Sequence, residues 1–352
     1  MEKRTIEKFE KKGTELIGGS LSHIYSYGDK TIKFYKGTDD RGFEKIRNEI
    51  AYLKTVPQDL REYFPPVLEV LNSHDLLAFS MPSYKKMKTL TDMILIHNED
   101  VKLVWKILKD VLYFMDHSIY TRKQCSVDKN YLERSQFARV ESALETLSKK
   151  ACGKDLVTAE FLYLNGEKLI NMTALLQRIR EDKKALKAMQ PLLLSYYHGN
   201  FHMANILSDK EKFILIDPRG ETIGSSDYDD AKMLCHLYIR YDEIHYGHFN
   251  LSKTKDDYFL NLTDREIGKK FDFLQQQFIQ YRLITSDENW LRRMQLLMGF
   301  HAVSFSSYHA RKKDVNWEKV AAYYLSGIKL LNDYFNTKET KANVALCPYI
   351  PN

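Results

Sequence analysis

The chain has 352 residues, of which 44% are hydrophobic and 28% charged, a composition typical of folded domains and unlike that of disordered or collagen-like chains. The formal net charge of +6 suits a small anionic ligand and is too low to indicate nucleic-acid binding. No uninterrupted apolar run approaches the roughly 18 residues of a membrane helix, and the first 15 residues contain no apolar signal-peptide segment. The four cysteines are far apart in the sequence and spell no zinc or redox motif. We therefore expect a cytoplasmic protein with reduced thiols, no membrane span and no nucleic-acid partner.

The first 84 residues predict a small antiparallel sheet with one helix packed on it. Apolar residues at helical spacing predict the helix over residues 42–54. Gly28-Asp29 favours a tight hairpin turn, because glycine and aspartate tolerate a positive φ. The strand-like segments are 15–17, 23–27, 31–35, 67–71 and 76–81, preceded by a short polar helix over 5–12.

After residue 85 the apolar pattern becomes helical. Thr263 and Glu266 have the spacing of a capping box, which predicts a helix start at Thr263. The expected helical stripes run over 104–115, 137–147, 175–179, 267–278, 288–305 and 317–334. A single β-like interruption is expected, a hairpin over 206–216. The predicted fold class is α+β and two-lobed, with an N-terminal sheet lobe over 1–84 and a larger helical lobe over 85–352.

The stretch 197–217 contains the residues that indicate chemistry. His198-Gly199 precedes Asn200, Asn205 follows five positions later, and Asp217 ends a short hairpin. Phosphoryl transfer from ATP needs a residue that orients the acceptor hydroxyl, and an amide and a carboxylate that hold Mg²⁺. Asn205 and Asp217 each flank a strand of the hairpin, so both are expected at one edge of the nucleotide as metal ligands. A surface hairpin without function remains the alternative.

The N-terminal sheet supplies further phosphate-binding candidates in order. Gly19 and Ser20 lie between the first two strands, where backbone N–H groups can approach phosphates. Lys33 lies in a mostly apolar strand, from which it can reach the α- and β-phosphates. Glu49 on the following helix can pair with Lys33 and aim it. Each residue alone is weak support, but their order together with the downstream motif is stronger.

These residues together resemble the aminoglycoside phosphotransferase and choline kinase family. That family's signature is H-G-D-x-x-x-x-N followed by a hydrophobic strand and I-D, and here it runs from His198 to Asn205 and ends at Asp217. The resemblance implies a protein-kinase-like fold, with ATP between the lobes and its adenine at Met81 and Tyr84. It implies ATP and Mg²⁺ as cofactors and a small-molecule hydroxyl as the phosphoryl acceptor, in the class of sugars, polyols or amino alcohols. The resemblance covers most of residues 15–240 in order.

The stretch IDPRGE, residues 216–221, is similar to phosphotransferase-like proteins of bacterial capsule and surface-polysaccharide biosynthesis. Arg219 and Glu221 in this stretch face either substrate or solvent. His202 is interpreted as a structural histidine of the loop. A kinase acting on protein is disfavoured, because no A-P-E-type segment follows Asp217.

Asn200 departs from the family pattern, which has an aspartate as the catalytic base at this position. An amide has nearly the same shape as a carboxylate but cannot accept a proton. Three interpretations remain open: an introduced Asp-to-Asn substitution that inactivates a phosphotransferase, a naturally inactive nucleotide-binding pseudokinase with a regulatory or scaffold role, and catalysis with less help from a base. The other candidates, Lys33, Glu49, Asn205 and Asp217, are all present, which favours the first interpretation.

Overall fold

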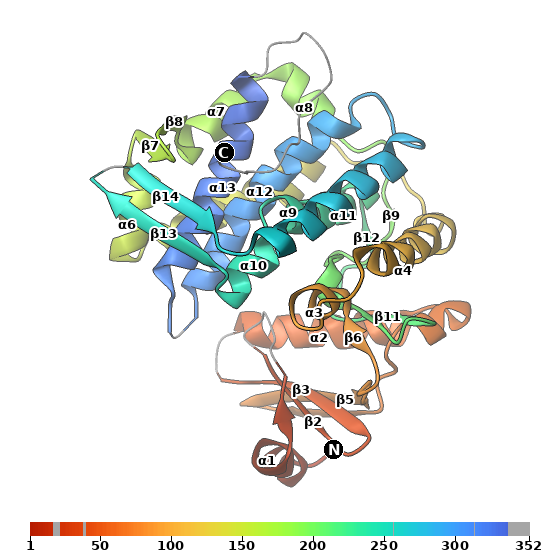
Figure 1. Cartoon of the computed structure of the whole chain (residues 1–352). Coiled ribbons are helices and arrows are strands. Elements are labelled where there is room, and N and C mark those ends of the chain that lie inside the picture. The colour runs from red at the N-terminus through yellow and green to blue at the C-terminus, as the bar shows by residue number, and fades with distance from the viewer. Residues whose placement is uncertain (17–21, 38–39, 256, 313, 337–352) are drawn as a thin grey trace. The chain divides into compact units, whose positions relative to one another are not determined.

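The computed structural model describes residues 1–16, 22–37, 40–255, 257–312 and 314–336. The chain folds into two compact units (Figure 1). Unit 1 consists of residues 1–124 and 195–224, and unit 2 of residues 125–194 and 225–352. All the motif residues up to position 224 thus belong to unit 1, although residues 125–194 separate its two segments in the sequence. The boundary expected between residues 84 and 85 divides a nucleotide-binding lobe from a catalytic and substrate-binding lobe, and it stays a prediction.

Unit 1 is built on a five-stranded sheet in which every neighbouring pair is antiparallel. Its order is β1 (Thr14–Glu15), β2 (His23–Tyr27), β3 (Lys30–Lys36), β5 (Leu76–Pro82) and β4 (Glu69–Ser73). Among the described residues the predicted strands are confirmed within one or two residues at their ends, and Ile17 of the first predicted strand lies outside them. Gly28 adopts a φ of +63° in the turn between β2 and β3, as the hairpin predicted.

Two helices cover opposite faces of this sheet (Figure 1). Helix α1 (Lys3–Lys12) buries Ile6 and Phe9 against Ile32 and Phe34 of β3. Helix α2 (Asp40–Thr55) packs on β3 and β5. Successive residues of a strand point to opposite faces, so Lys33 faces α2 while its two neighbours face α1. The sequence alternation of β3 therefore determines which helix the lysine can reach.

The second segment of unit 1 adds short strands beside this sheet. Strand β10 (Ile206–Ser208) pairs with β11 (Phe213–Leu215), which confirms the predicted hairpin, and with β6 (Lys88–Thr89) on its other side. Strand β9 (Ser195–Tyr196) pairs with β12 (Ile223–Gly224). The remaining helical elements of unit 1 are η1 (Gln58–Tyr63), α3 (Leu90–Leu95), α4 (Val101–Phe114), the π-helical turn η2 (Met115–Ile119) and the 3₁₀ turn η4 (Met203–Asn205).

Unit 2 is mainly helical, as the apolar stripes predicted. The almost wholly buried helix α12 (Trp290–Ala310) packs on α13 (Trp317–Asn336), α9 (Ser226–Tyr238) and α5 (Ala138–Ser148). The other helices are η3 (Glu133–Phe137), α6 (Ala151–Thr158), α7 (Met172–Glu181), α8 (Lys183–Met189), α10 (Tyr241–Tyr246) and α11 (Arg265–Leu283). The predicted capping box at Thr263 is wrong by one residue. Asp264 caps α11, because its carboxylate accepts the backbone N–H groups of Glu266 and Ile267 at 3.0 Å each.

Unit 2 also contains a four-stranded sheet, so the expectation of a single β interruption is wrong. The sheet order is β13 (Phe249–Thr254), β14 (Asp257–Leu262), β7 (Phe161–Leu164) and β8 (Glu167–Ile170), with β14 parallel to β7. Asn165 and Gly166 both have positive φ in the turn between β7 and β8. Asn-Gly is the strongest short hairpin signal, so this pair of strands could have been predicted. None of the described helices is long and apolar enough to cross a membrane.

Candidate functional site

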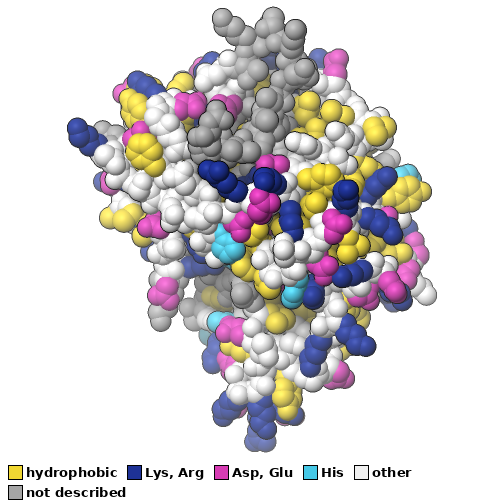
Figure 2. All heavy atoms as spheres, viewed as in Figure 1, with side chains coloured by type: hydrophobic (Ala, Val, Ile, Leu, Met, Phe, Trp, Pro, Cys, Tyr) yellow, Lys and Arg dark blue, Asp and Glu magenta, His cyan; other side chains and the backbone are white. Residues whose placement is uncertain are grey.

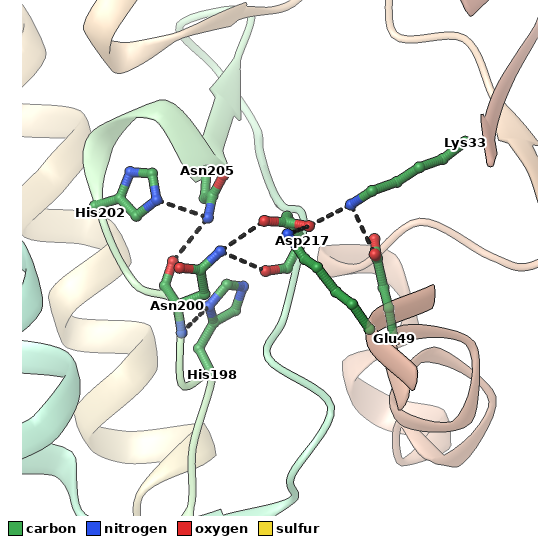
Figure 3. Close-up of polar contacts among 8 residues, drawn as sticks. Lys33, Glu49, His198, Asn200, His202, Asn205 and Asp217 are labelled. Carbon is green, nitrogen blue, oxygen red and sulfur yellow. Dashed lines mark hydrogen bonds and ion pairs between the residues drawn. The ribbon is translucent and has the colours of Figure 1, made fainter. Parts of the chain in front are cut away.

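Lys33 lies at the centre of a charged cluster in unit 1. Its Nζ is 2.7 Å from Oε2 of Glu49 on α2 and contacts Oδ1 of Asp217 (Figure 3). Only 3% of the lysine side chain is exposed. Burial alone would lower the pKa of Lys33, but the two carboxylates outweigh it and raise that pKa, so the lysine stays charged. The predicted pairing of Lys33 with Glu49 is confirmed.

Helix α2 is tied to the motif loops, and these contacts position Glu49. The hydroxyl of Tyr52 donates to the backbone carbonyl of Tyr197 at 3.0 Å. Gly220 has a φ of +103° and lies so close to α2 that a Cβ there would clash with the Cβ of Asn48. Only glycine fits both this conformation and this contact. Buried in this setting, Glu49 has a raised pKa, and its ion pair with Lys33 opposes that effect of burial.

The two motif loops are held to each other by backbone hydrogen bonds. The N–H of Arg219 donates to the carbonyl of His198, and the N–H of Ile216 to that of Asn205, both at 3.0 Å. Gly199 has a φ of +74°, and a Cβ there would meet the side chain of Arg219 at 2.7 Å. The spacing HG-N-x₄-N followed by I-D thus folds into one compact structure in which position 200 faces the end of the hairpin.

Asn200 is hydrogen-bonded directly to Asp217. Its Nδ2 donates to Oδ2 of Asp217 at 2.6 Å and to the backbone carbonyl of Asp217 at 3.0 Å (Figure 3). The backbone N–H of Asn200 donates to Nδ1 of His198 at 3.2 Å, which fixes the start of the loop. Asp217 itself has a φ of +55°, a left-handed conformation uncommon for a residue other than glycine. Burial raises the pKa of Asp217, but Lys33 and Lys45 together lower it by more, so this carboxylate is ionised.

Asn205 is oriented by the same loop. Its Nδ2 donates to the carbonyl of Asn200 at 2.8 Å and lies 3.0 Å from Nε2 of His202. Because Nδ2 makes both contacts, Oδ1 is the amide atom suited to a metal ion. His202, expected to be a structural histidine of the loop, thus contacts a side chain of that loop.

Lys45 also belongs to this cluster, and sequence reasoning missed it. It lies on α2 one turn before Glu49, and its Nζ is 3.6 Å from Oδ1 of Asp217. Burial lowers its pKa, with Lys33 adding to that effect and Asp217 opposing it. The i, i+4 spacing from Glu49 was the available signal, because residues four apart share one helix face.

The other predicted residues are less closely connected to the cluster. Gly19 and Ser20 lie outside the described residues. Met81 pairs with Thr31 near the end of β5, and Tyr84, whose pKa burial raises, follows two residues after that strand. In the IDPRGE stretch, Arg219 is 3.4 Å from Glu221, which also accepts a hydrogen bond from Tyr197 at 2.9 Å.

Comparison with known proteins identifies the fold. Over 96% of this chain and 95% of the other, the structure superposes on a choline/ethanolamine kinase family protein from Mesorhizobium loti, with a TM-score of 0.51 and 12% identity. An aminoglycoside phosphotransferase from Streptomyces rimosus gives a TM-score of 0.46 at 13% identity, over 94% of this chain and 99% of the other. A choline kinase from Cryptosporidium parvum gives 0.47 at 13% identity, over 91% and 88%. No protein-family profile and no curated protein sequence matches the chain.

The first of these superpositions covers nearly all of both chains. It confirms the predicted α+β fold class, a protein-kinase-like fold with an antiparallel N-terminal sheet and a helical C-terminal region. At 12% identity the likeness concerns the fold alone. The function must therefore be argued from the residues of the site.

Proposed function

We propose that this protein is an ATP-dependent phosphotransferase that moves the γ-phosphoryl group to a hydroxyl of a small molecule. The observation that carries the proposal is the cluster in which Lys33 joins Glu49 and Asp217, with Asn200 hydrogen-bonded to the same aspartate. Residues from two stretches of the chain, 33–49 and 200–217, meet there, and they are of the types that bind phosphates and metal in phosphoryl transfer. An ion-pair cluster with a purely structural role would not need the side-chain amides of Asn200 and Asn205 beside it.

In this proposal each residue has one task. Lys33, aimed by Glu49, binds the α- and β-phosphates, while Met81 and Tyr84 at the end of β5 hold the adenine. Asn205, through Oδ1, and Asp217 hold Mg²⁺. These two residues fit the metal, because Asn205 presents an oxygen and Asp217 is ionised. Bound Mg²⁺ neutralises phosphate charge and orients the phosphates.

The reaction is an in-line displacement at the γ-phosphorus. The acceptor oxygen forms a bond to phosphorus as the bond to the bridging oxygen of ADP breaks, and the hydroxyl proton is released. Asn200 faces this region but cannot accept that proton, so the proton passes to water or to a phosphate oxygen. The chain contributes positioning and charge, which supply most of the catalysis in phosphoryl transfer.

We propose a sugar, polyol or amino alcohol as the acceptor and the cytoplasm, where ATP is available, as the location. The acceptor class rests on the resemblance to the aminoglycoside phosphotransferase and choline kinase family, and residues 216–221 are in addition similar to capsule-associated phosphotransferase-like proteins. That six-residue similarity is the whole basis for a connection to surface polysaccharides.

A second function, a nucleotide-binding pseudokinase, is favoured by one specific contact. Asn200 donates to both the side chain and the backbone of Asp217, so the amide is integrated into the ligand-free structure. An amide that stabilises the site in this way is compatible with a native residue in a protein that binds nucleotide and does not transfer phosphate. The charged cluster would bind nucleotide in either case and does not distinguish the phosphotransferase from the pseudokinase.

The first experiment is a thermal-shift titration with ATP in the presence and absence of Mg²⁺. A ligand that binds only the native state stabilises it and so raises Tm. At a ligand concentration 100 times the Kd, the added free energy of unfolding is about 2.7 kcal/mol. We expect a shift with Mg²⁺-ATP, and its magnesium dependence should disappear in Asp217→Asn, which keeps the shape but not the charge. Absence of any shift with purine nucleotides at millimolar concentrations would overturn both functions. Transfer to a panel of sugars, polyols and amino alcohols then separates the enzyme from the pseudokinase.

A further inference from the structure

Two lysines, and not only the proposed phosphate-binding Lys33, surround the carboxylate of Asp217. Lys33 contacts Oδ1, Lys45 lies 3.6 Å from the same oxygen, and Nδ2 of Asn200 donates to Oδ2 at 2.6 Å. Both oxygens of this proposed metal ligand are thus already engaged by donors of the chain. A metal ion that binds Asp217 must share these oxygens with the donors or displace one of them.

The two lysines differ in their freedom to move. The Lys33 side chain is 3% exposed and is fixed between two carboxylates. The Lys45 side chain is 34% exposed, and its distance to Asp217 is that of an ion pair without a hydrogen bond. The flexible four-carbon stem of a lysine allows its ammonium group to move away from such a contact at low cost. Lys45 is therefore the cation that can leave Asp217.

The formal charges of the cluster sum to zero. Lys33 and Lys45 contribute +2, Glu49 and Asp217 contribute −2, and the amides of Asn200 and Asn205 contribute none. In the part of the chain that the structure describes, no group of three or more His, Cys, Asp or Glu side chains is placed to hold a metal ion. The cluster thus has no excess negative charge to attract a bare divalent cation, which would instead arrive with the phosphates.

We propose that Lys45 is a second phosphate-binding residue of the nucleotide site, held on Asp217 in the free protein and transferred to the phosphates when the nucleotide binds. This inference rests on the proposed nucleotide site and adds two properties to it. Two lysines allow the site to bind a nucleotide without metal. The pairing of Lys45 with Asp217 also weakens the binding of a divalent cation without nucleotide.

The test is isothermal titration calorimetry of the full chain with ATP in EDTA, ATP in Mg²⁺, and adenosine. We expect Lys45→Met to raise the Kd for ATP in EDTA by about 10–100-fold, the loss of one charge-assisted contact. The Kd for adenosine should stay the same, because adenosine has no phosphate. Lys45→Arg keeps the charge and should stay within a few-fold of the wild type. Lys54→Met, which removes an exposed lysine from the same helix, is the matched control and should change nothing.

A second measurement uses Mn²⁺ alone, without nucleotide. Lys45→Met leaves the cluster with a net charge of −1, so it should bind Mn²⁺ more tightly than the wild type does, by about 10-fold. Lys45→Gln, which keeps a polar side chain on α2, repeats both measurements if the methionine variant does not fold.

The outcomes separate this inference from the proposed function. If Lys45→Met weakens adenosine and ATP equally, or leaves ATP binding in EDTA unchanged, Lys45 is not a phosphate-binding residue and the inference fails while the nucleotide site stands. If the wild type binds neither adenosine nor ATP, the nucleotide site fails and the inference with it.

Discussion

At the scale of single residues, position 200 decides between an enzyme and a pseudoenzyme. An aspartate there would accept the proton of the acceptor hydroxyl, but it would also place a second carboxylate where Asn200 now donates to Asp217 at 2.6 Å. Asn200→Asp should therefore favour phosphoryl transfer and at the same time destabilise the ligand-free structure. Both effects can be measured.

We predict that Asn200→Asp raises phosphoryl transfer from ATP by about 10²–10⁴-fold, the usual effect of a positioned base. In the absence of Mg²⁺ the variant should be less stable than the wild type by about 1–3 kcal/mol, because a partly buried hydrogen bond is replaced by two facing carboxylates. Added Mg²⁺ should restore part of that stability. Single-turnover transfer from labelled ATP and urea unfolding with and without Mg²⁺ measure the two effects.

Asn200→Ala is the control for this prediction, because it removes the amide and introduces no carboxylate. It should lose the hydrogen bond to Asp217 and gain no activity. If Asn200→Asp binds Mg²⁺-ATP but neither transfers phosphate nor hydrolyses ATP faster than Asn200→Ala, the absence of a base is not what limits this protein. The pseudokinase function would then be the better one.

The sequence was informative for residues that belong to an ordered motif and uninformative for those that join the site through packing. Lys33 and Glu49 could be paired in advance, because strand, helix and motif follow one another in a known order, and their 2.7 Å contact confirms it. Lys45 has no motif of its own, and a lysine on a helix is usually solvated. Its place became evident only when α2 and Asp217 were seen together.

At the scale of elements, the close approach of the 216–222 loop to α2 positions Glu49. Gly220 allows that approach, because a Cβ there would clash with the Cβ of Asn48 and lie 2.7 Å from its backbone carbon. Backbone atoms of a helix cannot move aside as the end of a flexible side chain can. The contact therefore couples the loop that carries Asp217 to the helix that carries Glu49 and Lys45.

We predict that Gly220→Ala lowers the free energy of unfolding by about 2–4 kcal/mol, through overpacking together with a positive φ. It should also weaken ATP binding, because α2 must shift away from the loop. Gly28→Ala is the matched control: Gly28 has a φ of +63° in the same unit, but a Cβ there would have nothing within 4 Å, so only backbone strain is added. Urea unfolding and calorimetry with ATP give the two quantities. Equal losses in both variants would show that the contact with Asn48 is unimportant.

Elements with strong periodicity were predictable, and elements defined by partners distant in sequence were not. The strands of the first sheet and helices α4, α11, α12 and α13 were placed from apolar spacing together with turn and capping residues. The four-stranded sheet of unit 2 was missed, because its strands have four to six residues and β14 pairs with β7 across about 90 intervening residues. The pairing of β14 with β7 leaves no local pattern in the sequence. The β7–β8 hairpin is local, and its Asn165-Gly166 turn was a signal that could have predicted it.

At the scale of the whole molecule, charges of both signs are mixed on the face of the surface drawn in Figure 2. On the face drawn in Figure 2, Lys and Arg side chains lie among Asp and Glu side chains and apolar ones. This distribution accords with a formal net charge of +6 in 352 residues. The electrostatic features with the largest consequences are instead buried, in the cluster of unit 1 and in a group of histidines in unit 2.

Two histidines of unit 2, the buried His309 and the half-buried His245, lie among aromatic rings and cations. Nε2 of His309 is 3.0 Å from the hydroxyl of Tyr241, and the ring centroids of His245 and His309 are 5.6 Å apart. Burial lowers the pKa of His309 from 6.5 to about 3, with Lys312, His245, Lys319 and His236 adding to the effect. Burial likewise lowers the pKa of His245 to about 4, where Asp242 opposes the change and the two lysines add to it. Both histidines are therefore neutral in the folded protein at pH 5.

We predict that the free energy of unfolding falls as the pH is lowered from 7 to 5, by about 2 kcal/mol for each of these histidines. The sign follows from the direction of the shift: below pH 6.5 the unfolded chain binds protons that the folded chain rejects until about pH 4 for His245 and about pH 3 for His309. His309→Gln should remove about half of the pH dependence that the pair produces. Urea unfolding at pH 5, 6 and 7 measures how the free energy of unfolding depends on pH. If His309→Gln does not reduce this dependence, His309 is not one of its sources.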